Sequence, residues 1–323
     1  MNLNNSDTSS GKLRCRICDN KRGNSRYRVR EMMFGTREEF DYFQCAVCGC
    51  LQIEAFPVEM SRYYPEAYYS LTPGTVAKLA HYFRDEYAFT GKGLLGRLVF
   101  ELFPNDALKY VSRLDVPPTA RILDVGCGSG SVVDCLTRHG YDNVTGIDPF
   151  INADRMLRSD ALLKKASIEY LEGQWDFIMF NHSMEHMQDP LLAFQSAKRL
   201  LGDDGLCIVR IPTVSSYAWE HYSTDWVQLD APRHFFIFSV HSIELLSAKA
   251  GMRVVEITND SIPLQLWGSE QYQRDISLFS KQSLMTNPLA RTFSRAEKKM
   301  FKRRTCELNE AGQGDQIAVV LER

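Results

Sequence analysis

Arg121-Ile-Leu-Asp-Val-Gly-Cys-Gly-Ser-Gly130 is the stretch that decides the fold, because a short apolar run leads directly into three alternating glycines. This pattern predicts a strand that turns sharply into a helix beginning near Ser131. Gly126, Gly128 and Gly130 carry no Cβ atoms, so the backbone N–H groups of the turn can approach a ligand closely. The amino end of the helix favours anionic groups. The stretch therefore predicts a cofactor site of the nucleotide type.

The spacing of the glycines distinguishes between cofactors. A dinucleotide-binding turn has the spacing G-x-G-x-x-G, which requires glycine at the position of Ser131. Asp124 precedes the first glycine, where a carboxylate would repel a pyrophosphate and attract an ammonium group. Asp148 ends a second apolar run that begins at Val144, and it is placed to bind ribose hydroxyls. One acid for an amine and one for a ribose predict S-adenosylmethionine as the cofactor.

With these residues the chain resembles the class I S-adenosylmethionine-dependent methyltransferases over roughly residues 116 to 260. The resemblance implies an α/β fold with a Rossmann-like, seven-stranded sheet whose last strand is antiparallel. A Rossmann-like domain without this cofactor is the alternative. The residues expected to bind the cofactor are Asp124, Gly126, Cys127, Gly128, Gly130, Asp148, Pro149, Ser167, Ile168 and Asn181. Relatives often carry an acid or amide for adenine where Ser167 stands, so adenine recognition would depend on backbone groups or on Ile168.

Apolar runs and helix signals predict the remaining elements of this domain. Asp189 is a helix N-cap followed by Pro190, and Ser294 with Glu297 forms a capping box. The predicted strands are 161–166, 175–180, 206–211, 253–258 and an antiparallel closing strand 316–322. The predicted helices are 131–139, 151–159, 190–201, 241–249 and 295–308.

Length and composition favour an ordinary globular enzyme. The 323 residues are 44% hydrophobic and 24% charged, with a net charge of −2, so the overall balance requires neither a nucleic acid nor a membrane as partner. The amino-terminal residues do not have the pattern of a signal peptide, and no stretch is long and apolar enough to insert in a membrane. Nine cysteines without a signal peptide predict reduced thiols and a cytoplasmic location. The sequence does not indicate an oligomeric state.

Two C-x-x-C pairs, Cys15 with Cys18 and Cys45 with Cys48, predict a tetrahedral structural zinc site. The residues between the pairs, around 27–43, are expected to form a β-hairpin. Cys50 is a further thiol that could replace a ligand, although a free thiol is favoured. We therefore expect a zinc ribbon over residues 1–56, a helical and aromatic lid with linker over 57–115, and the methyltransferase domain over 116–323. The lid would include the tyrosine-rich segment 62–70, which could equally be a seam between ribbon and main domain.

The segment Lys12 to Arg30 is rich in Lys and Arg and contains a single acid, Asp19. This local charge permits a second hypothesis, an RNA methyltransferase that binds its substrate through the zinc ribbon. No aromatic platform for bases accompanies the charge. A solvated ribbon face, or a face packed on the catalytic domain, is the favoured interpretation, and nucleic acid is disfavoured.

A polar and aromatic segment follows the predicted strand 206–211, at the edge of the sheet where substrates bind. Its residues suit a polar, ring-shaped substrate. The candidate substrate-binding residues are Tyr217, Trp219, His221, Tyr222, Asp225, Trp226, Asp230 and Arg233. The other strand end, at Asn181-His182-Ser183, lacks the N/D-P-P-Y/F pattern typical of DNA and protein amino-methylases. His186, in a Glu-His pair, is expected to orient other groups or to support the structure.

Arg233-His-Phe-Phe-Ile-Phe-Ser239 resembles the E-H-F-x-x-F-S stretch of zinc-ribbon sugar C-methyltransferases, in which the histidine is the catalytic base. The resemblance implies a sugar substrate, on a nucleotide or a glycan, for surface polysaccharides or glycosylated metabolites. His234 matches the catalytic histidine, and His182 is the second candidate. Arg233 replaces the glutamate of the family, which places O-methylation ahead of C-methylation. A non-catalytic binding module that holds S-adenosylmethionine as a structural ligand is the remaining alternative.

Overall fold

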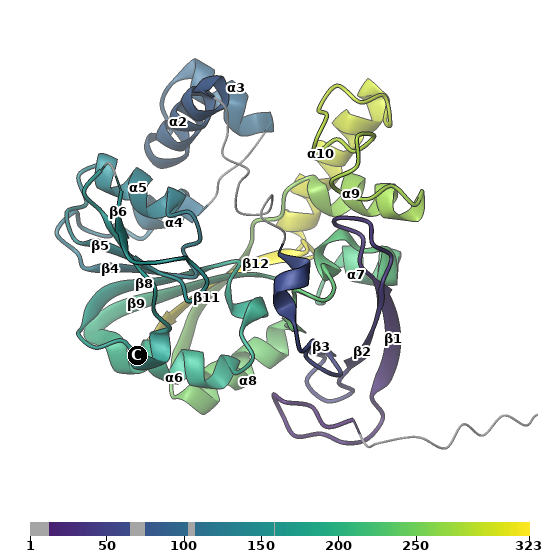
Figure 1. Ribbon diagram of the computed structural model, residues 1–323, viewed down its shortest axis with the longest axis horizontal. Coiled ribbons are helices and arrows are strands. Elements are labelled where there is room, and N and C mark those ends of the chain that lie inside the picture. Colours follow the sequence, from purple (N-terminus) through teal and green to yellow (C-terminus); the bar gives the residue numbers. More distant parts are fainter. Residues whose placement is uncertain (1–12, 65–74, 103–106, 158) are drawn as a thin grey trace, which may run out of the picture.

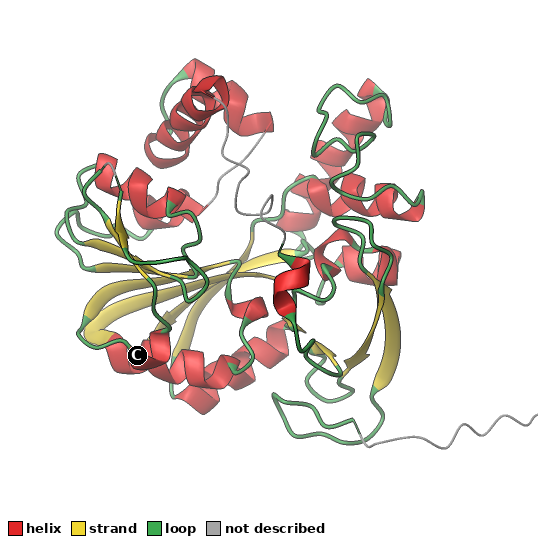
Figure 2. Cartoon of the chain, in the orientation of Figure 1, coloured by secondary structure: helices red, strands yellow, loops and turns green. Residues whose placement is uncertain are grey.

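The computed structural model describes residues 13–64, 75–102, 107–157 and 159–323. The described strands form an eight-stranded sheet of order β11-β12-β9-β8-β4-β5-β7-β6 and a four-stranded sheet of order β1-β2-β3-β10 (Figures 1 and 2). The strands are β1 (Ser25–Arg30), β2 (Glu39–Gln44), β3 (Leu51–Ile53), β4 (Ile122–Val125), β5 (Val144–Ile147), β6 (Arg155–Met156), β7 (Leu162–Lys164), β8 (Trp175–Asn181), β9 (Leu201–Pro212), β10 (Phe236–Ile237), β11 (Arg253–Asn259) and β12 (Gln316–Glu322).

Helices cover both faces of the large sheet (Figure 2). The described helices are α2 (Thr75–Thr90), α3 (Leu94–Leu102), α4 (Ala107–Arg113), α5 (Ser131–Arg138), α6 (Pro190–Leu200), α7 (Tyr217–Tyr222), α8 (Val240–Ala250), α9 (Leu264–Gln273) and α10 (Arg295–Glu310). Of these, α4 and α5 lie on one face of the large sheet and α6 and α8 on the other. Strand β8 shows why two layers form, because its side chains alternate between two buried clusters. Phe177 and Met179 lie in the cluster that contains residues of α4 and α5. Ile178 and Phe180 lie in the cluster that contains residues of α6 and α8.

The order and direction of the strands confirm the predicted Rossmann-like α/β architecture. Strands β4, β5, β7, β8 and β9 pair in parallel. Strand β12 inserts antiparallel between β9 and β11, which confirms the antiparallel closing strand. The predicted helix caps are confirmed as well: the Asp189 side chain accepts a hydrogen bond from Leu192 N, and Ser294 with Glu297 forms a capping box. Strand β9 is longer than predicted and begins directly after α6, so Gly202 lies within a strand.

The prediction of a helix over residues 151–159 was wrong. This segment instead contributes β6, which pairs antiparallel with β7 and gives the sheet eight strands rather than seven. The Asp154 carboxylate accepts a hydrogen bond from Lys165 N at 2.7 Å, and Leu157 N donates to Ala161 O at 2.8 Å. A polar side chain that bonds a neighbouring backbone group competes with a helix, and here it favours a hairpin.

The amino-terminal unit contains the predicted hairpin, with Tyr27 of β1 opposite Tyr42 of β2. Its sheet is completed by β10, which comes from the segment that contains His234 and pairs antiparallel with β3. Figure 1 shows this unit beside the helices of the carboxyl-terminal half of the chain. The unit is therefore joined by main-chain hydrogen bonds to a segment of the carboxyl-terminal half of the chain.

The segment proposed as a lid is only partly described. The helical part expected of this segment is confirmed among the described residues, which form α2, α3 and α4. Tyr63 is buried and its hydroxyl donates to Glu38 Oε1 at 2.9 Å. The Tyr64 hydroxyl lies 3.2 Å from His186 Nδ1. Tyr68 and Tyr69 of the proposed lid lie outside the described residues.

Candidate active site

The glycine turn lies between β4 and α5, at the carboxyl end of the parallel strands. All three glycines have positive φ, at +79° for Gly126, +51° for Gly128 and +81° for Gly130. A Cβ atom on Gly126 would lie 2.4 Å from Ser183 Cβ, and one on Gly130 would lie 2.6 Å from a methyl of Leu163. A Cβ on Gly128 would meet no atom within 4 Å. The first and third glycines are thus needed for packing, whereas the second borders open space that a ligand can enter.

Asp148 fixes the glycine turn from the end of β5. Its Oδ2 accepts a hydrogen bond from Gly128 N at 3.0 Å, and its Oδ1 accepts one from Phe150 N at 2.8 Å. The turn is also tied to β5 by Gly126 N, which donates to Ile147 O at 2.8 Å. The predicted ribose-binding acid and the predicted glycine turn are therefore brought together.

Asp124, in β4, is only 3% exposed, and this burial raises the pKa of its carboxyl to about 7. A cationic partner would reverse this rise, because it stabilises the ionised carboxylate. On the adjacent strand β8, the amide nitrogen and oxygen of Asn181 are buried without a hydrogen-bond partner. The Asn181 amide lies beside the Asp124 carboxylate, whose ionised form it favours, and its remaining hydrogen-bonding capacity is available to a ligand. These groups and the open space at Gly128 fit S-adenosylmethionine.

The other predicted cofactor residues lie at the ends of the neighbouring strands. Cys127 is buried against Gly146 of β5, and Pro149 follows Asp148 on the surface. Ile168 is buried, and the Ser167 hydroxyl, just beyond β7, donates to the Glu169 carboxylate. Their contact with a cofactor stays a prediction.

Four polar residues gather just beyond β8. The His182 Nδ1 lies 3.4 Å from Glu185 Oε1, and the His234 Nε2 lies 3.9 Å from the same oxygen. The rings of His186 and His234 lie edge to face, with centroids 4.7 Å apart. Phe235 N donates to Glu185 O at 2.8 Å, which holds the two segments in register. Because β8 neighbours β4 and Ser183 packs on Gly126, this cluster lies beside the glycine turn.

The two candidate bases have different environments. His234 is buried, its Nδ1 donates to Gln228 O at 2.8 Å, and burial together with the nearby His186 lowers its pKa to about 4. The His234 imidazole is therefore neutral at pH 7, with a free lone pair on Nε2. The side chain of His182 is 38% exposed, so it can exchange a proton with solvent.

The predicted substrate residues lie mainly along the contact with the amino-terminal unit. Trp219 packs edge-on against Tyr27, with ring centroids 5.0 Å apart. The carboxylate of Asp225 lies 3.4 Å from the Arg30 guanidinium. Trp226 is fully buried. Its indole N–H donates to the Asp315 carboxylate, the Tyr222 hydroxyl donates to Glu270, and Tyr217 stacks on the exposed His221.

Asp230 and Arg233 form a buried ion pair at 2.5 Å, and the Arg233 guanidinium also lies 2.9 Å from Glu31 Oε1. Arg233 donates a further hydrogen bond to Tyr63 O. In this structure the aromatic and charged residues of the segment thus fix it to the amino-terminal unit. Their contact with a substrate stays a prediction.

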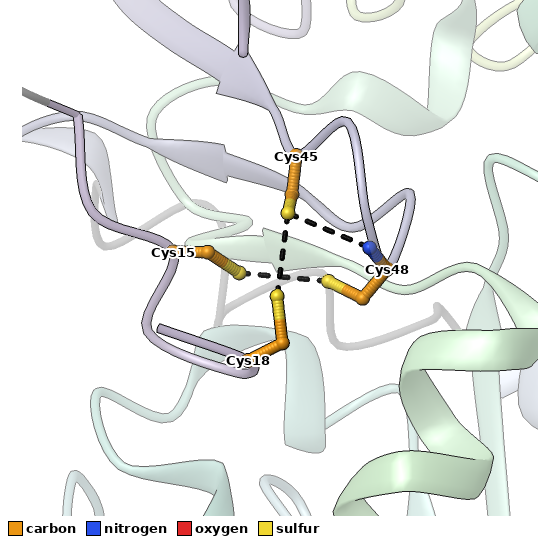
Figure 3. Close-up of side chains that lie close together, drawn as sticks. All are labelled: Cys15, Cys18, Cys45 and Cys48. Atoms are coloured by element: carbon orange, nitrogen blue, oxygen red, sulfur yellow. Dashed lines mark hydrogen bonds between the residues drawn. The ribbon is translucent and has the colours of Figure 1, made fainter. Parts of the chain in front are cut away.

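The four cysteines of the two C-x-x-C pairs converge, as Figure 3 shows. Cys15 Sγ lies 3.5 Å from Cys48 Sγ, and Cys18 Sγ lies 3.4 Å from Cys45 Sγ. These separations exceed the roughly 2.05 Å of a disulfide and approach the ~3.8 Å between thiolates that each bind zinc at ~2.3 Å. All four sulfur atoms lie within 4.8 Å of one another, so they could hold a metal ion. Cys50 is buried nearby but outside this group.

Comparison with known proteins identifies the domain. Residues 95–257 match the sequence profile of the family described as Methyltransferase domain. The chain belongs to this family of methyltransferase domains and has a Rossmann-like α/β fold.

Two curated relatives bear the name ubiquinone biosynthesis O-methyltransferase. The one from Erwinia tasmaniensis is 27% identical over 110 residues, which are 31% of this chain and 45% of the relative. The one from Actinobacillus pleuropneumoniae is 33% identical over 101 residues, which are 27% of this chain and 43% of the relative. The chain therefore spans less than half the length of these relatives. A possible histamine N-methyltransferase from Thermotoga maritima has a TM-score of 0.43 and 16% identity, covering 82% of this chain and 99% of its own.

Among the described residues, no helix combines the length and the apolar character that crossing a bilayer requires.

Sequence patterns did not predict the central place of Glu185, which is fully buried among three histidines. The signal that was available is the Glu-His pair directly beyond a buried strand. Sequence patterns also missed Glu31 and Tyr42 of the amino-terminal unit. Glu31 pairs with Arg233, and the Tyr42 hydroxyl donates to His234 O at 2.8 Å. No local pattern links residues so far apart in the chain.

We expect Gly128→Ala to abolish cofactor binding while the protein stays folded. The new methyl would point into the open space at the turn, and its positive φ would cost roughly 1 kcal/mol. Gly140→Ala is the matched control, because Gly140 also has positive φ and no atom within 4 Å of a Cβ, but lies beyond α5. Calorimetric titration with S-adenosylmethionine checks this. Equal loss of binding in both variants, or in neither, would contradict the assignment.

We also expect S-adenosylmethionine affinity to rise with pH and to level off near the pKa of Asp124, about 7. Below that pH the carboxyl is protonated and cannot attract the ammonium group, so affinity should be roughly tenfold weaker at about pH 5.5 than at about pH 7.5. Asp124→Asn should bind weakly at both values and lose most of the pH dependence. A steep dependence that persists in this variant would assign the titration to another group.

Proposed function

We propose that this methyltransferase transfers a methyl group to a hydroxyl of a sugar, carried on a nucleotide or a glycan, in the synthesis of surface polysaccharides or glycosylated metabolites. The observation that carries the proposal is the segment Arg233 to Ser239. It resembles the histidine segment of the zinc-ribbon sugar methyltransferases, and its His234 lies against the Glu-His turn beside the cofactor site. Its strand β10 is also paired with the unit that contains the four cysteines.

Two observations favour an oxygen acceptor over a carbon acceptor. The curated relatives are named O-methyltransferases. Arg233 stands where the C-methyltransferases have a glutamate beside the histidine, and its guanidinium is occupied by Asp230, Glu31 and Tyr63 O. A guanidinium stays protonated and accepts no proton, so this position offers no base beside His234 for removing a proton from carbon.

When bound, S-adenosylmethionine supplies an electrophilic methyl group and leaves as a neutral thioether, so the leaving group needs no acid. The contribution of the chain is alignment of the two reactants and activation of the acceptor hydroxyl. Asp124 would hold the ammonium group and Asp148 the ribose, with the turn at Gly128 close to the cofactor. A histidine of the chain would accept the proton of the acceptor hydroxyl as its oxygen takes the methyl group, and the thioether would leave with the electron pair of the broken carbon–sulfur bond.

His234 is the first candidate for the histidine that receives this proton, and His182 is the second. The free Nε2 of His234 faces the carboxylates of Glu185 and Asp230, at 3.9 and 3.8 Å. Its lowered pKa makes it a weak base, whereas His182 is more exposed. General-base catalysis is most effective when the pKa of the base lies near the working pH. The test of the proposal therefore includes both residues.

We further propose that Cys15, Cys18, Cys45 and Cys48 bind a structural Zn²⁺. The backbone N–H groups of Ile17 and Val47 donate to Cys15 Sγ and Cys45 Sγ, both at 3.4 Å, and such bonds stabilise thiolates. With four thiolates the ion would have no open position for a substrate. The proposed division is a zinc ribbon over residues 1–56, a lid and linker over 57–115 and the methyltransferase domain over 116–323.

The contacts of the basic amino-terminal segment do not favour the alternative of an RNA substrate. Arg14 pairs with Asp19, Arg26 with Glu54, Arg28 with Asp41 and Arg30 with Asp225. These four side chains therefore already have partners of opposite charge. A surface that binds phosphates would present such cations without carboxylates beside them.

Purified protein should transfer labelled methyl from S-adenosylmethionine to a member of a panel of nucleotide sugars, with the position identified by product mass and fragmentation. His234→Ala should keep its affinity for S-adenosylmethionine and lose turnover by roughly a hundred- to ten-thousand-fold. His182→Ala is measured in parallel, and His241→Ala on the surface of α8 is the matched control. Unchanged turnover in His234→Ala with equal cofactor affinity would refute its role. Salt-sensitive methylation of RNA with no sugar product would refute the substrate.

Cys45→Ser should lower the zinc content by one equivalent per chain, measured by mass spectrometry of the metal. Because β3 holds β10, this variant should also unfold at a lower temperature and lose turnover. Cys306→Ser, which changes an exposed thiol outside the four-cysteine group, is the control. Full zinc content in Cys45→Ser would exclude Cys45 as a ligand.

A further inference from the structure

Glu185, His186 and His234 form a second group able to hold a metal ion, separate from the four cysteines. One ligand atom from each residue lies within 4.8 Å of the other two. The His234 Nε2 and Glu185 Oε1 are 3.9 Å apart. Bonds of roughly 2.1 Å from a zinc-sized ion to nitrogen and to oxygen would span up to about 4.2 Å between the two ligand atoms. This pair can therefore share one ion without movement of the backbone.

Both imidazoles are held in the tautomer that a metal ligand requires. The Nδ1 of His186 lies 2.9 Å from Arg233 O and 3.2 Å from the Tyr64 hydroxyl, which can accept as well as donate. The Nδ1 of His234 lies 2.8 Å from Gln228 O. A backbone carbonyl can only accept, so each Nδ1 carries the hydrogen and each Nε2 keeps its lone pair. Histidines that bind metals in proteins are oriented in this way, with the second ring nitrogen bonded to a carbonyl or carboxylate.

The Glu185 carboxylate is the independent observation that points to a cation. Its side chain is fully buried, and neither oxygen has a hydrogen-bond partner among the described residues. A buried carboxylate without partners is strongly unfavourable unless a positive charge compensates it. The nearest nitrogen is the His182 Nδ1 at 3.4 Å, and an imidazolium there is the competing source of charge.

We propose that Glu185, His186 and His234 bind one divalent first-row transition metal ion, such as Zn²⁺ or Mn²⁺, beside the methyl-transfer site. Two imidazoles and one carboxylate suit such ions, and they leave coordination positions open for water or for substrate oxygens. Glu185 and His186 follow β8, and His234 precedes β10. The three residues therefore lie at the same edge of the large sheet as the cofactor turn, and the coordination positions they leave open would be at that edge.

This assignment deepens the proposed function and rests on it for the identity of the acceptor. A sugar hydroxyl in the open position would be oriented and made more acidic by the cation. His234 would then act as a ligand and positioning residue, since its Nε2 lone pair would be shared with the metal. The proton released from the hydroxyl would pass to His182, which lies beside the group and reaches solvent.

Titration with Mn²⁺ followed by electron paramagnetic resonance tests the site without any acceptor. The unaltered chain, purified with its cysteine-bound metal, should bind one Mn²⁺, because four thiolates favour softer ions. Glu185→Gln and His186→Gln should weaken Mn²⁺ binding at least tenfold and retain their circular dichroism and S-adenosylmethionine affinity. His241→Gln, a substitution of an exposed histidine, should bind as the unaltered chain does. Pulsed measurements on the unaltered chain should detect coupling to imidazole nitrogen, which requires no variant to fold.

Absence of Mn²⁺ and Zn²⁺ binding beyond one zinc per chain, with S-adenosylmethionine present, would overturn the proposal and leave Glu185 paired with a charged His182. Binding without nitrogen coupling, or binding by Glu185→Gln and His186→Gln as strong as that of the unaltered chain, would overturn it too. A chain that binds the metal with the expected ligands but methylates no sugar would support the site and refute only the substrate.

Discussion

The short antiparallel pairing of β3 with β10 is the constraint on which the site depends. It places Phe236 opposite Gln52 and Ile237 opposite Leu51, so the strand next to the second C-x-x-C pair holds the strand next to His234. Further bonds reinforce the pairing: the Tyr42 hydroxyl donates to His234 O, and Lys249 Nζ donates to Ile17 O. The position of His234 therefore depends on correct folding of the unit that contains the four cysteines. A metal held by the cysteines can support catalysis without touching a substrate.

Buried charge adds a second constraint at the same junction. Arg233 is fully buried, and burial alone would lower the pKa of its guanidinium, yet Asp230 and Glu31 raise it above the ordinary value. Removing one partner from such a buried pair costs about 3–5 kcal/mol, because the other charge is left uncompensated. The arginine that distinguishes this chain from the sugar C-methyltransferases is thus accommodated by a carboxylate from the amino-terminal unit. Replacing the glutamate of that family by Arg233 thus changes how the segment is held to the amino-terminal unit, as well as which group lies beside the histidine.

The methyltransferase sheet and its cofactor turn follow closely from local sequence. Glycines at positive φ, an aspartate at the end of each of two neighbouring strands and a capped helix are all short-range features, and each was predicted at its position. The prediction failed between residues 151 and 159, where the Asp154 carboxylate bonds Lys165 N and favours a hairpin over a helix. That bond depends on a partner beyond the next strand. Local helix signals carry no information about it.

The sequence by itself determined the fold class, the cofactor and the grouping of the four cysteines, because each rests on spacings within a few residues. Only the tertiary structure showed that Glu185, His186 and His234 lie together. From the sequence, His234 was predicted to be a catalytic base, and His186 was predicted to orient other groups or to support the structure. Folding brings both rings to one buried carboxylate through backbone bonds between segments far apart in the chain. Such convergence depends on the register between strands and loops, which no single stretch of sequence encodes.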